Sequence, residues 1–264
     1  MSDGDYLLGT QDVEVERLGL QHRVWRDEML AGFRAAGFGP GLTILDVGSG
    51  PGHATADLAE LVGPAGKVIA YERAPHFVEA LEARNLANVE VRSVDLMCDN
   101  LGGALADGAW TRWVLAFLPD PASAVAKIAT ALKPGGTAVF HEYLDYEAWR
   151  LIPQPPEHRR YRDLVVKSWR ESGGEPDAAL ELPRWLADAG MDAVAIRPMV
   201  RIISPADAMW EWPASFMATN AYRLHALGYC SEDEARAFSV LLDDPAPSLR
   251  MLTPVVAEVI ARKR

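Results

Sequence analysis

Residues 44–55, ILDVGSGPGHAT, constrain the fold more than any other stretch of this chain. The run ILDV leads into three glycines at alternate positions, and a helix-like segment follows. A near-continuous apolar run is typical of a strand inside a parallel sheet, because such a strand is covered on both faces. The stretch therefore predicts a strand, a glycine-rich turn and the start of a helix, which together can hold a ligand against backbone amides.

Before and after this turn, the hydrophobic pattern alternates between the period of an α-helix and that of a β-strand. A helical pattern over 10–36 ends at Gly37 and Gly39. Alternating strands and helices joined by short loops predict an α/β, Rossmann-like doubly wound sheet. The predicted strands cover 42–47, 66–72, 88–95, 108–117 and 136–143, and the predicted helices cover 52–61, 75–87 and 120–132, before a turn at 133–136, KPGG.

The alternation breaks after residue 143. Four prolines and one helical pattern over 157–172 mark the first interruption, and a second helical interruption covers about 205–244. Between and after them we expect a helix at 179–189 and strands at 192–202 and 252–264. Both interruptions are interpreted as a lid, because long insertions in compact α/β domains are often functional; the alternatives are core completion or the interface of a possible homodimer. The expected parts are a helical cap (1–40), a cofactor-binding core (41–143), a lid (144–178), and completion of the core with the second insertion (179–264).

Composition narrows the classes of partner and location. The 264 residues carry a formal net charge of −11, which disfavours a nucleic-acid partner because phosphate contacts need a basic surface. Two cysteines make neither a disulfide framework nor a zinc cluster. Residues 1–8 lack the pattern of a secretory signal, and no apolar run approaches the roughly 20 residues that span a bilayer. We therefore expect a cytoplasmic protein with no membrane partner.

The spacing of the glycine turn limits which cofactor it can hold. Gly48, Gly50 and Gly52 read G-x-G-x-G, whereas the dinucleotide fingerprint G-x-G-x-x-G wants glycine where His53 stands. The phosphate loop fails as well, since no Lys-Ser/Thr pair follows. Asp46 would face the same turn, where it suits an ammonium group better than a pyrophosphate. This spacing disfavours an NAD-dependent oxidoreductase, which stays an alternative.

Acidic residues also end the next two predicted strands. Glu72 closes the second strand, where a carboxylate can accept hydrogen bonds from ribose hydroxyls. Asp95 follows the third strand, in position for an adenine amino group, with Leu96 beside the ring. Because the carboxyl ends of parallel strands share one edge, we expect these residues to gather there with Asp46.

At this point the sequence resembles the class I S-adenosylmethionine-dependent methyltransferase family. The resemblance covers about residues 42–143 and rests on ILDVGSGPG (44–52), YER (71–73), VDLM (94–97), DGAWTRWVLAFLPDP (107–121) and ALKPGGTAVFHEY (131–143), with a leading helix over 6–25. It implies a seven-stranded sheet with an antiparallel last strand, and S-adenosylmethionine as cofactor. The implied cofactor contacts are Asp46, Gly48, Ser49, Gly50, Gly52, His53, Glu72, Arg73, Asp95, Leu96, Arg112 and Trp113.

Two residues of the first helix are further cofactor candidates. Arg17 and Gln21 lie one helical turn apart, so one of them could reach the cofactor carboxylate or cover the pocket. The alternative is a local surface pairing, of Arg17 with Glu14 or of Gln21 with Trp25.

The chemistry expected is in-line methyl transfer, in which alignment does most of the work and a general base is optional. His141, at the end of the fifth strand, is the base candidate, and a hydrogen-bonded structural histidine is its alternative. Tyr143, Tyr146 and Trp149 could form an aromatic wall for substrate, or merely pack the insertion against the sheet. Such a wall suits a planar or apolar acceptor, or a tertiary or quaternary amine.

The predicted function is thus metal-independent methylation of O, N or C of a small molecule. Residues 117–122, FLPDPA, lack the Asn/Asp/Ser-Pro-Pro-aromatic motif of nucleic-acid amino methyltransferases. A protein that binds the cofactor without transferring a methyl group remains the other alternative, since fold alone does not give function.

Overall fold

The computed structural model describes residues 12–264 and contains a seven-stranded sheet. Its strand order is β3-β2-β1-β4-β5-β10-β7, with β10 antiparallel to both neighbours and the first five strands parallel. This confirms the predicted fold class. The strands are β1 (Thr43–Val47), β2 (Lys67–Glu72), β3 (Val89–Ser93), β4 (Ala106–Arg112), β5 (Leu132–Asp145), β7 (Met191–Met199) and β10 (Val255–Lys263).

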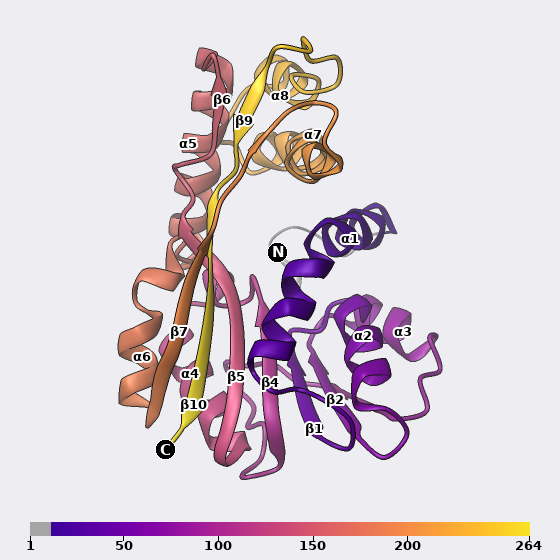
Figure 1. The fold of residues 1–264 in the computed structure, drawn as a ribbon. Helices are drawn as coiled ribbons and strands as arrows, with labels where there is room; N and C mark the ends of the chain where they lie inside the picture. Colours follow the sequence, from indigo (N-terminus) through magenta and orange to yellow (C-terminus); the bar gives the residue numbers. More distant parts are fainter. Residues whose placement is uncertain (1–11) are drawn as a thin grey trace.

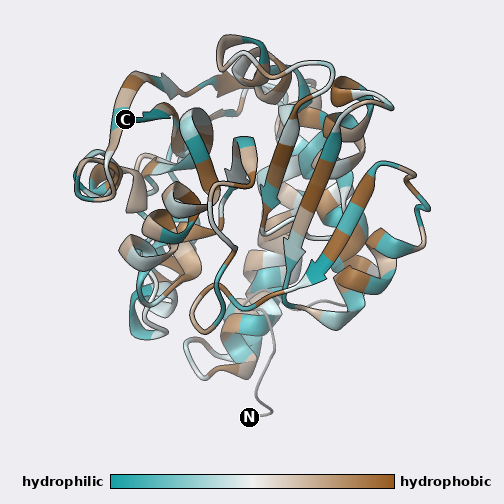
Figure 2. Ribbon diagram, turned by 90° about the horizontal axis from the view of Figure 1, so that it is seen from below, coloured by the Kyte–Doolittle hydropathy of each residue, from teal (hydrophilic) through white to brown (hydrophobic). Residues whose placement is uncertain are grey.

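Helices cover both faces of this sheet. Successive strand residues point to opposite faces, so Ile44 packs with Phe33 of α1 and Leu58 of α2, whereas Leu45 lies in a cluster with Leu186 of α6. Figure 2 shows apolar residues concentrated along the strands and hydrophilic residues on the outer helices. The helices are α1 (Asp12–Ala35), α2 (His53–Val62), α3 (Pro75–Glu82), α4 (Pro121–Ala131), α5 (Pro156–Glu171), α6 (Leu182–Asp188), α7 (Glu211–Ala226) and α8 (Glu232–Ser239). None of these described helices is long and apolar enough to cross a membrane.

A second sheet joins the two interruptions of the alternating pattern. Strand β9 (Arg250–Leu252) pairs with β6 (Arg150–Ile152) on one side and β8 (Ile202–Ile203) on the other. In Figure 1 this sheet and helices α5, α7 and α8 stand above the large sheet, and α1 passes between the two parts. We call this assembly of β6, β8, β9, α5, α7 and α8 the cap.

Several predicted boundaries move in the structure. The strand predicted over 108–117 stops at Arg112, because Trp113 has a positive φ of 51° and a short 3-10 helix, Leu115–Phe117, follows. The helix predicted over 75–87 ends at Glu82, and the strand predicted over 192–202 divides into β7 and β8. Strand β5 begins before the predicted start, since Leu132 already pairs with Ala106 and the KPGG turn forms an irregularity within the strand. The predicted first helix begins at Asp12; its residues 10 and 11, like the rest of 1–11, lie outside the described part.

Candidate functional site

The turn after β1 is built from three glycines with left-handed backbone. Gly48, Gly50 and Gly52 have φ values of 73°, 54° and 80°. A Cβ at Gly48 would overlap Val114, and one at Gly52 would overlap Leu81, so neither position has room for a side chain. A Cβ at Gly50 would have only Leu18 near it, at 4.0 Å, because this glycine borders an open cleft. The turn therefore presents bare backbone to the cleft, as L-residues rarely can at positive φ.

The cleft has a volume of about 930 Å³ and brings together most of the predicted cofactor residues. Binding sites for small molecules typically measure roughly 300–1,000 Å³, so the cleft is large enough for a cofactor and part of a second ligand. Gly52 and Arg17 are absent from its lining: Gly52 packs under the turn, and Arg17 faces the neighbouring pocket. The predicted residues that line it are Gln21, Asp46, Gly48, Ser49, Gly50, His53, Glu72, Arg73, Asp95, Leu96, Arg112 and Trp113.

Backbone amides hold the two carboxylates at the strand ends. Glu72 accepts hydrogen bonds from the amides of Gly50 (2.9 Å), Arg73 (2.8 Å) and Ala74 (2.9 Å). Asp95 accepts one from the Met97 amide at 2.8 Å. Glu72 thus ties the end of β2 to the glycine turn, and its carboxylate is fixed at the cleft by groups that no side-chain change would remove.

A buried acid and a partly buried arginine influence each other electrostatically behind the turn. Asp46 is 1% exposed and accepts a hydrogen bond of 2.6 Å from the Thr55 hydroxyl. Burial raises the pKa of Asp46 to about 7, against the opposing effects of Thr55 and the nearby Arg112. Burial likewise lowers the pKa of Arg112 to about 10, so its guanidinium is still charged at neutral pH.

Helix α1 contributes a histidine that was not among the predicted site residues. His22 lies in the cleft lining, with Nε2 at 2.9 Å from Asp57 and Nδ1 at 3.5 Å from Arg112 Nη2. A guanidinium can only donate, so Nδ1 accepts and the ring proton sits on Nε2, toward Asp57. Burial lowers the pKa of His22, which keeps this neutral form. His22 therefore positions Arg112.

Glu142 organises the loop after β4 and was also missed. It is fully buried and accepts hydrogen bonds from the amides of Val114 (2.9 Å), Leu115 (2.9 Å) and Ala116 (3.4 Å). Burial raises the pKa of Glu142 to about 7 despite these amides. Its signal in the sequence was an acid inside a buried strand, AVFHEY, where a charge needs partners. Fixing this loop also fixes Trp113, whose left-handed backbone is strained for a bulky residue.

Next to the cleft, aromatic rings enclose a second, smaller pocket of about 30 Å³, called here the aromatic pocket. Gln21, Trp113 and Phe117 line both spaces, so the two are neighbours. The predicted wall is brought together here, with further rings from α5 and α7. Its rings include Trp113, Tyr143, Tyr146, Trp149, Trp169 and Trp212.

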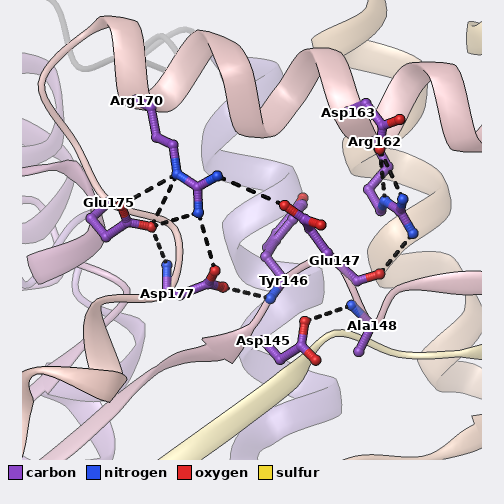
Figure 3. A network of polar contacts seen from close by, with 9 residues as sticks. All are labelled: Asp145, Tyr146, Glu147, Ala148, Arg162, Asp163, Arg170, Glu175 and Asp177. Atoms are coloured by element: carbon purple, nitrogen blue, oxygen red, sulfur yellow. Dashed lines mark hydrogen bonds and ion pairs between the residues drawn. The ribbon is translucent and has the colours of Figure 1, made fainter.

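Polar contacts fix the turn that carries two of these rings (Figure 3). Asp177 accepts a hydrogen bond from the Tyr146 amide at 2.7 Å, and Arg170 binds Asp177 at 3.3 Å. Arg162 donates to the carbonyl oxygens of Glu147 (2.7 Å) and Trp149 (3.3 Å). Helix α5 therefore holds the segment after β5 in place, so that Tyr146 and Trp149 face the aromatic pocket.

The other first-helix candidates turn toward the same pocket. Arg17 forms a buried ion pair with Glu14, with both distances at 2.7 Å, as its local-pairing alternative expected. Gln21 accepts hydrogen bonds from Arg17 Nη1 (3.2 Å) and Trp212 Nε1 (3.0 Å). Thus Gln21, rather than Arg17, reaches the cofactor cleft.

The structure places His141 away from both spaces. It is fully buried, its Nε2 lies 3.0 Å from Glu258, and it packs edge-on against Trp110. Glu258 in turn binds Arg197 at 3.1 Å. A general base must approach the proton that it removes, so this placement favours the structural alternative for His141.

Unpartnered donors in the cleft test whether S-adenosylmethionine fits. Ser49 Oγ and Arg112 Nη1 are buried and have no hydrogen-bond partner among residues 12–264. Such groups are rare unless a ligand or water satisfies them. Together with Asp46 they suit the carboxylate and ammonium of an amino-acid moiety, and Glu72 and Asp95 suit a nucleoside. The residues present therefore fit this cofactor.

Comparisons with known proteins agree with this geometry. Residues 45–140 match the family model described as a methyltransferase domain. An uncharacterised 37.1 kDa transposon protein of Streptomyces fradiae is 32% identical over 64% of this chain and 49% of its own length. A demethylmenaquinone methyltransferase of Lactococcus lactis is 32% identical (46% and 49%), and a tRNA (adenine(58)-N(1))-methyltransferase of Thermus thermophilus is 36% identical (50% and 52%). The chain thus spans about half the length of these curated relatives.

A solved structure shows the same fold over most of the chain. The crystal structure of a putative methyltransferase from Bacillus halodurans has a TM-score of 0.61 and 15% identity, covering 90% of this chain and 99% of that one. The domain match, the sheet order and the glycine turn together define the class. Residues 45–140 therefore form a methyltransferase domain of the class I S-adenosylmethionine-dependent type, and S-adenosylmethionine is its cofactor. This assignment decides against the NAD-dependent alternative.

Proposed function

We propose that this chain transfers the methyl group of S-adenosylmethionine to an O, N or C atom of a small-molecule acceptor. The observation that carries the proposal is the meeting of the cofactor cleft and the aromatic pocket at Trp113, which lines both. The bound cofactor supplies an already activated methyl group, so the protein's task is to align it with an acceptor and to exclude water.

The cofactor half of the site follows from the groups on the cleft wall. The backbone of the glycine turn would lie along the methionine part, with Arg112 at the carboxylate and Asp46 at the ammonium. Glu72 would accept from the ribose hydroxyls and Asp95 from the adenine amino group. Arg112 supports this assignment best, because its Nη1 is buried and unpartnered while His22 accepts from its Nη2.

The acceptor half would be the aromatic pocket. Tyr143, Tyr146 and Trp149 are buried and belong to one apolar cluster with the cap, which keeps water away from the methyl position. No general base is assigned, since methyl transfer to an acceptor that ionises in solution needs alignment alone.

A small molecule fits the chain better than a nucleic acid, although one relative carries a tRNA methyltransferase name. The formal charge of −11 and the carboxylates of Glu72 and Asp95 at the cleft oppose a polyphosphate backbone. The demethylmenaquinone methyltransferase relative also favours a small acceptor. Metal independence and a possible homodimer stay predictions.

Calorimetry followed by a transfer assay tests the proposal. S-adenosylhomocysteine should bind the protein saturably, and NAD should not. The protein should then convert labelled S-adenosylmethionine to S-adenosylhomocysteine in the presence of a suitable member of a panel of phenols, amines and quinols. Absent S-adenosylhomocysteine binding would refute the cofactor site. Binding without transfer to any panel member would favour the non-catalytic alternative.

A further inference from the structure

Two residues that line the aromatic pocket carry hydrogen-bond donors that lack acceptors. The indole N–H groups of Trp113 and Trp149 are buried and have no partner among residues 12–264. The amide oxygen of Gln21 is already shared by Arg17 and Trp212. No aspartate or glutamate belongs to the described lining of this pocket. Because a buried donor without an acceptor is unfavourable, the pocket complements a ligand with acceptor atoms.

The charges around the pocket are cationic on the ring faces. The Arg17 guanidinium lies 5.6 Å from the centre of the Phe216 ring, and that of Arg112 lies 5.3 Å from the Trp113 ring. Both oxygens of Glu14 are engaged by Arg17, so this ion pair presents neither a free carboxylate nor an uncompensated cation to a ligand. An aromatic cage can bind a quaternary amine. Here the faces of Phe216 and Trp113 are already covered by arginine guanidinium groups, which a cationic acceptor would have to displace.

The rings also define the shape of the ligand. Trp113 lies between Tyr143, at 5.4 Å and 18°, and Trp212, at 5.3 Å and 14°, in one near-parallel stack. Offset stacks of this kind favour a planar ring as the next member. The pocket holds only about 30 Å³ as the rings stand, so a ligand must part them. Trp212 comes from α7 of the cap, whereas Trp113 directly follows β4 and Tyr143 lies in β5, so the parting would separate the cap from the large sheet.

We propose, resting on the methyltransferase function above, that the acceptor is a flat aromatic molecule bearing a carbonyl or phenolic oxygen, bound by ring stacking at Trp113 and by hydrogen bonds from the Trp113 and Trp149 indoles. The tertiary or quaternary amine that an aromatic wall alone would also suit is thereby disfavoured. Oxygen atoms of such a ligand would supply acceptors to the indole groups, and a neutral or anionic ring avoids repulsion from Arg112.

Calorimetric titration of the full chain saturated with S-adenosylhomocysteine tests this class. The two probes are 4-hydroxyacetophenone and phenyltrimethylammonium, which are similar in size and differ in charge and in acceptor oxygens. We expect saturable binding of 4-hydroxyacetophenone, at least about tenfold tighter than that of phenyltrimethylammonium. Equal or tighter binding of the cation, or no saturable binding of 4-hydroxyacetophenone, overturns the proposal.

Two substitutions locate the binding within the pocket. Trp113→Phe and Trp149→Phe keep an aromatic ring and remove the N–H, so each should weaken 4-hydroxyacetophenone binding about 3- to 10-fold. Trp185→Phe is the matched control, because Trp185 belongs to α6 and is buried in a different apolar cluster, outside the pocket, and should change nothing. The midpoint of thermal unfolding is measured on every variant as a check of the fold. Unchanged probe affinity in both pocket variants overturns the inference alone, whereas a wild-type chain that fails to bind S-adenosylhomocysteine overturns the proposed function.

Discussion

The cofactor side of the cleft is held largely by backbone groups, and the acceptor side is held by side chains. Gly48 and Gly50 expose their backbone, and Glu72 is fixed by three backbone amides. The acceptor side is a stack of rings brought from β5, from the loop after β4 and from α7. The Gln21–Trp212 hydrogen bond that closes this stack joins residues 191 positions apart.

Because they are built differently, the two sides should tolerate different substitutions. A backbone-built site depends on a few positions with unusual φ and should fail when one of them receives a side chain. A ring-built site depends on the packing of cap against sheet, so it should respond to cap stability and adapt to different ligands. Substitutions on one side should therefore leave the other side's ligand nearly unaffected, and the following experiments test that separation.

The largest effect is expected at Gly50. Gly50→Arg places a side chain in the cleft and forces a φ of 54° on a non-glycine residue. We expect S-adenosylhomocysteine affinity to fall at least about 100-fold in calorimetry, since lost contacts and strain add. Gly103→Arg is the control, because a Cβ at this exposed glycine meets no atom within 4 Å. Wild-type affinity in Gly50→Arg would mean that the glycine turn does not face the cofactor.

Truncation of a core side chain in the cap should lower the stability of the protein and leave cofactor affinity unchanged. Met251 is fully buried on β9, the strand that links β6 and β8. Met251→Ala should lower the free energy of unfolding by about 2–5 kcal/mol in urea titrations. Leu180→Ala, at a side chain that is 63% exposed, should cost far less. In the absence of denaturant, S-adenosylhomocysteine affinity of Met251→Ala should stay near wild type; a parallel loss of affinity would show that the two sides are one unit.

At Glu72 the expected effect on affinity is smaller. Glu72→Ala removes the proposed ribose acceptor together with the anchor of the Gly50 amide, and should weaken S-adenosylhomocysteine binding by about 1–3 kcal/mol. Glu72→Gln keeps one acceptor oxygen and should lose less. Adenine alone should bind both variants as it binds the wild type, because Asp95 is unchanged. Equal affinity of Glu72→Ala and wild type for S-adenosylhomocysteine would move the ribose contact elsewhere.

The same contrast explains what the sequence predicted and what it did not. The turn, Glu72 and Asp95 follow from local periodicity, because strand ends of a parallel sheet meet at one edge. The cap sheet escaped prediction, since β6, β8 and β9 are only two or three residues long and pair across long separations. His141 was expected near the cofactor because it ends a strand, but alternation within β5 points it at Glu258. Trp212 and Gln21 could not be joined without tertiary structure.

The smallest effect should come from the ionisation of Asp46. Its folded pKa of about 7 lies above its ordinary value of 3.8 because the carboxyl is buried. Between these values the folded state holds more protons than the unfolded state, so Asp46 contributes stability at low pH that is lost as the pH rises through about 7. Cofactor binding has the opposite sign, because the proposed ammonium contact needs the carboxylate. Affinity for S-adenosylhomocysteine should rise about tenfold between about pH 6 and pH 8.

Two variants assign this pH dependence to the right group. Asp46→Asn is neutral throughout and should bind weakly with a flat profile over that range. Glu142 has a similarly raised pKa but serves the loop amides, so Glu142→Gln should keep the wild-type slope. A slope that survives in Asp46→Asn and disappears in Glu142→Gln would transfer the effect to the loop after β4. In that case the cofactor side would depend on the same loop that carries Trp113, and the separation between the two sides would be weaker than the contacts suggest.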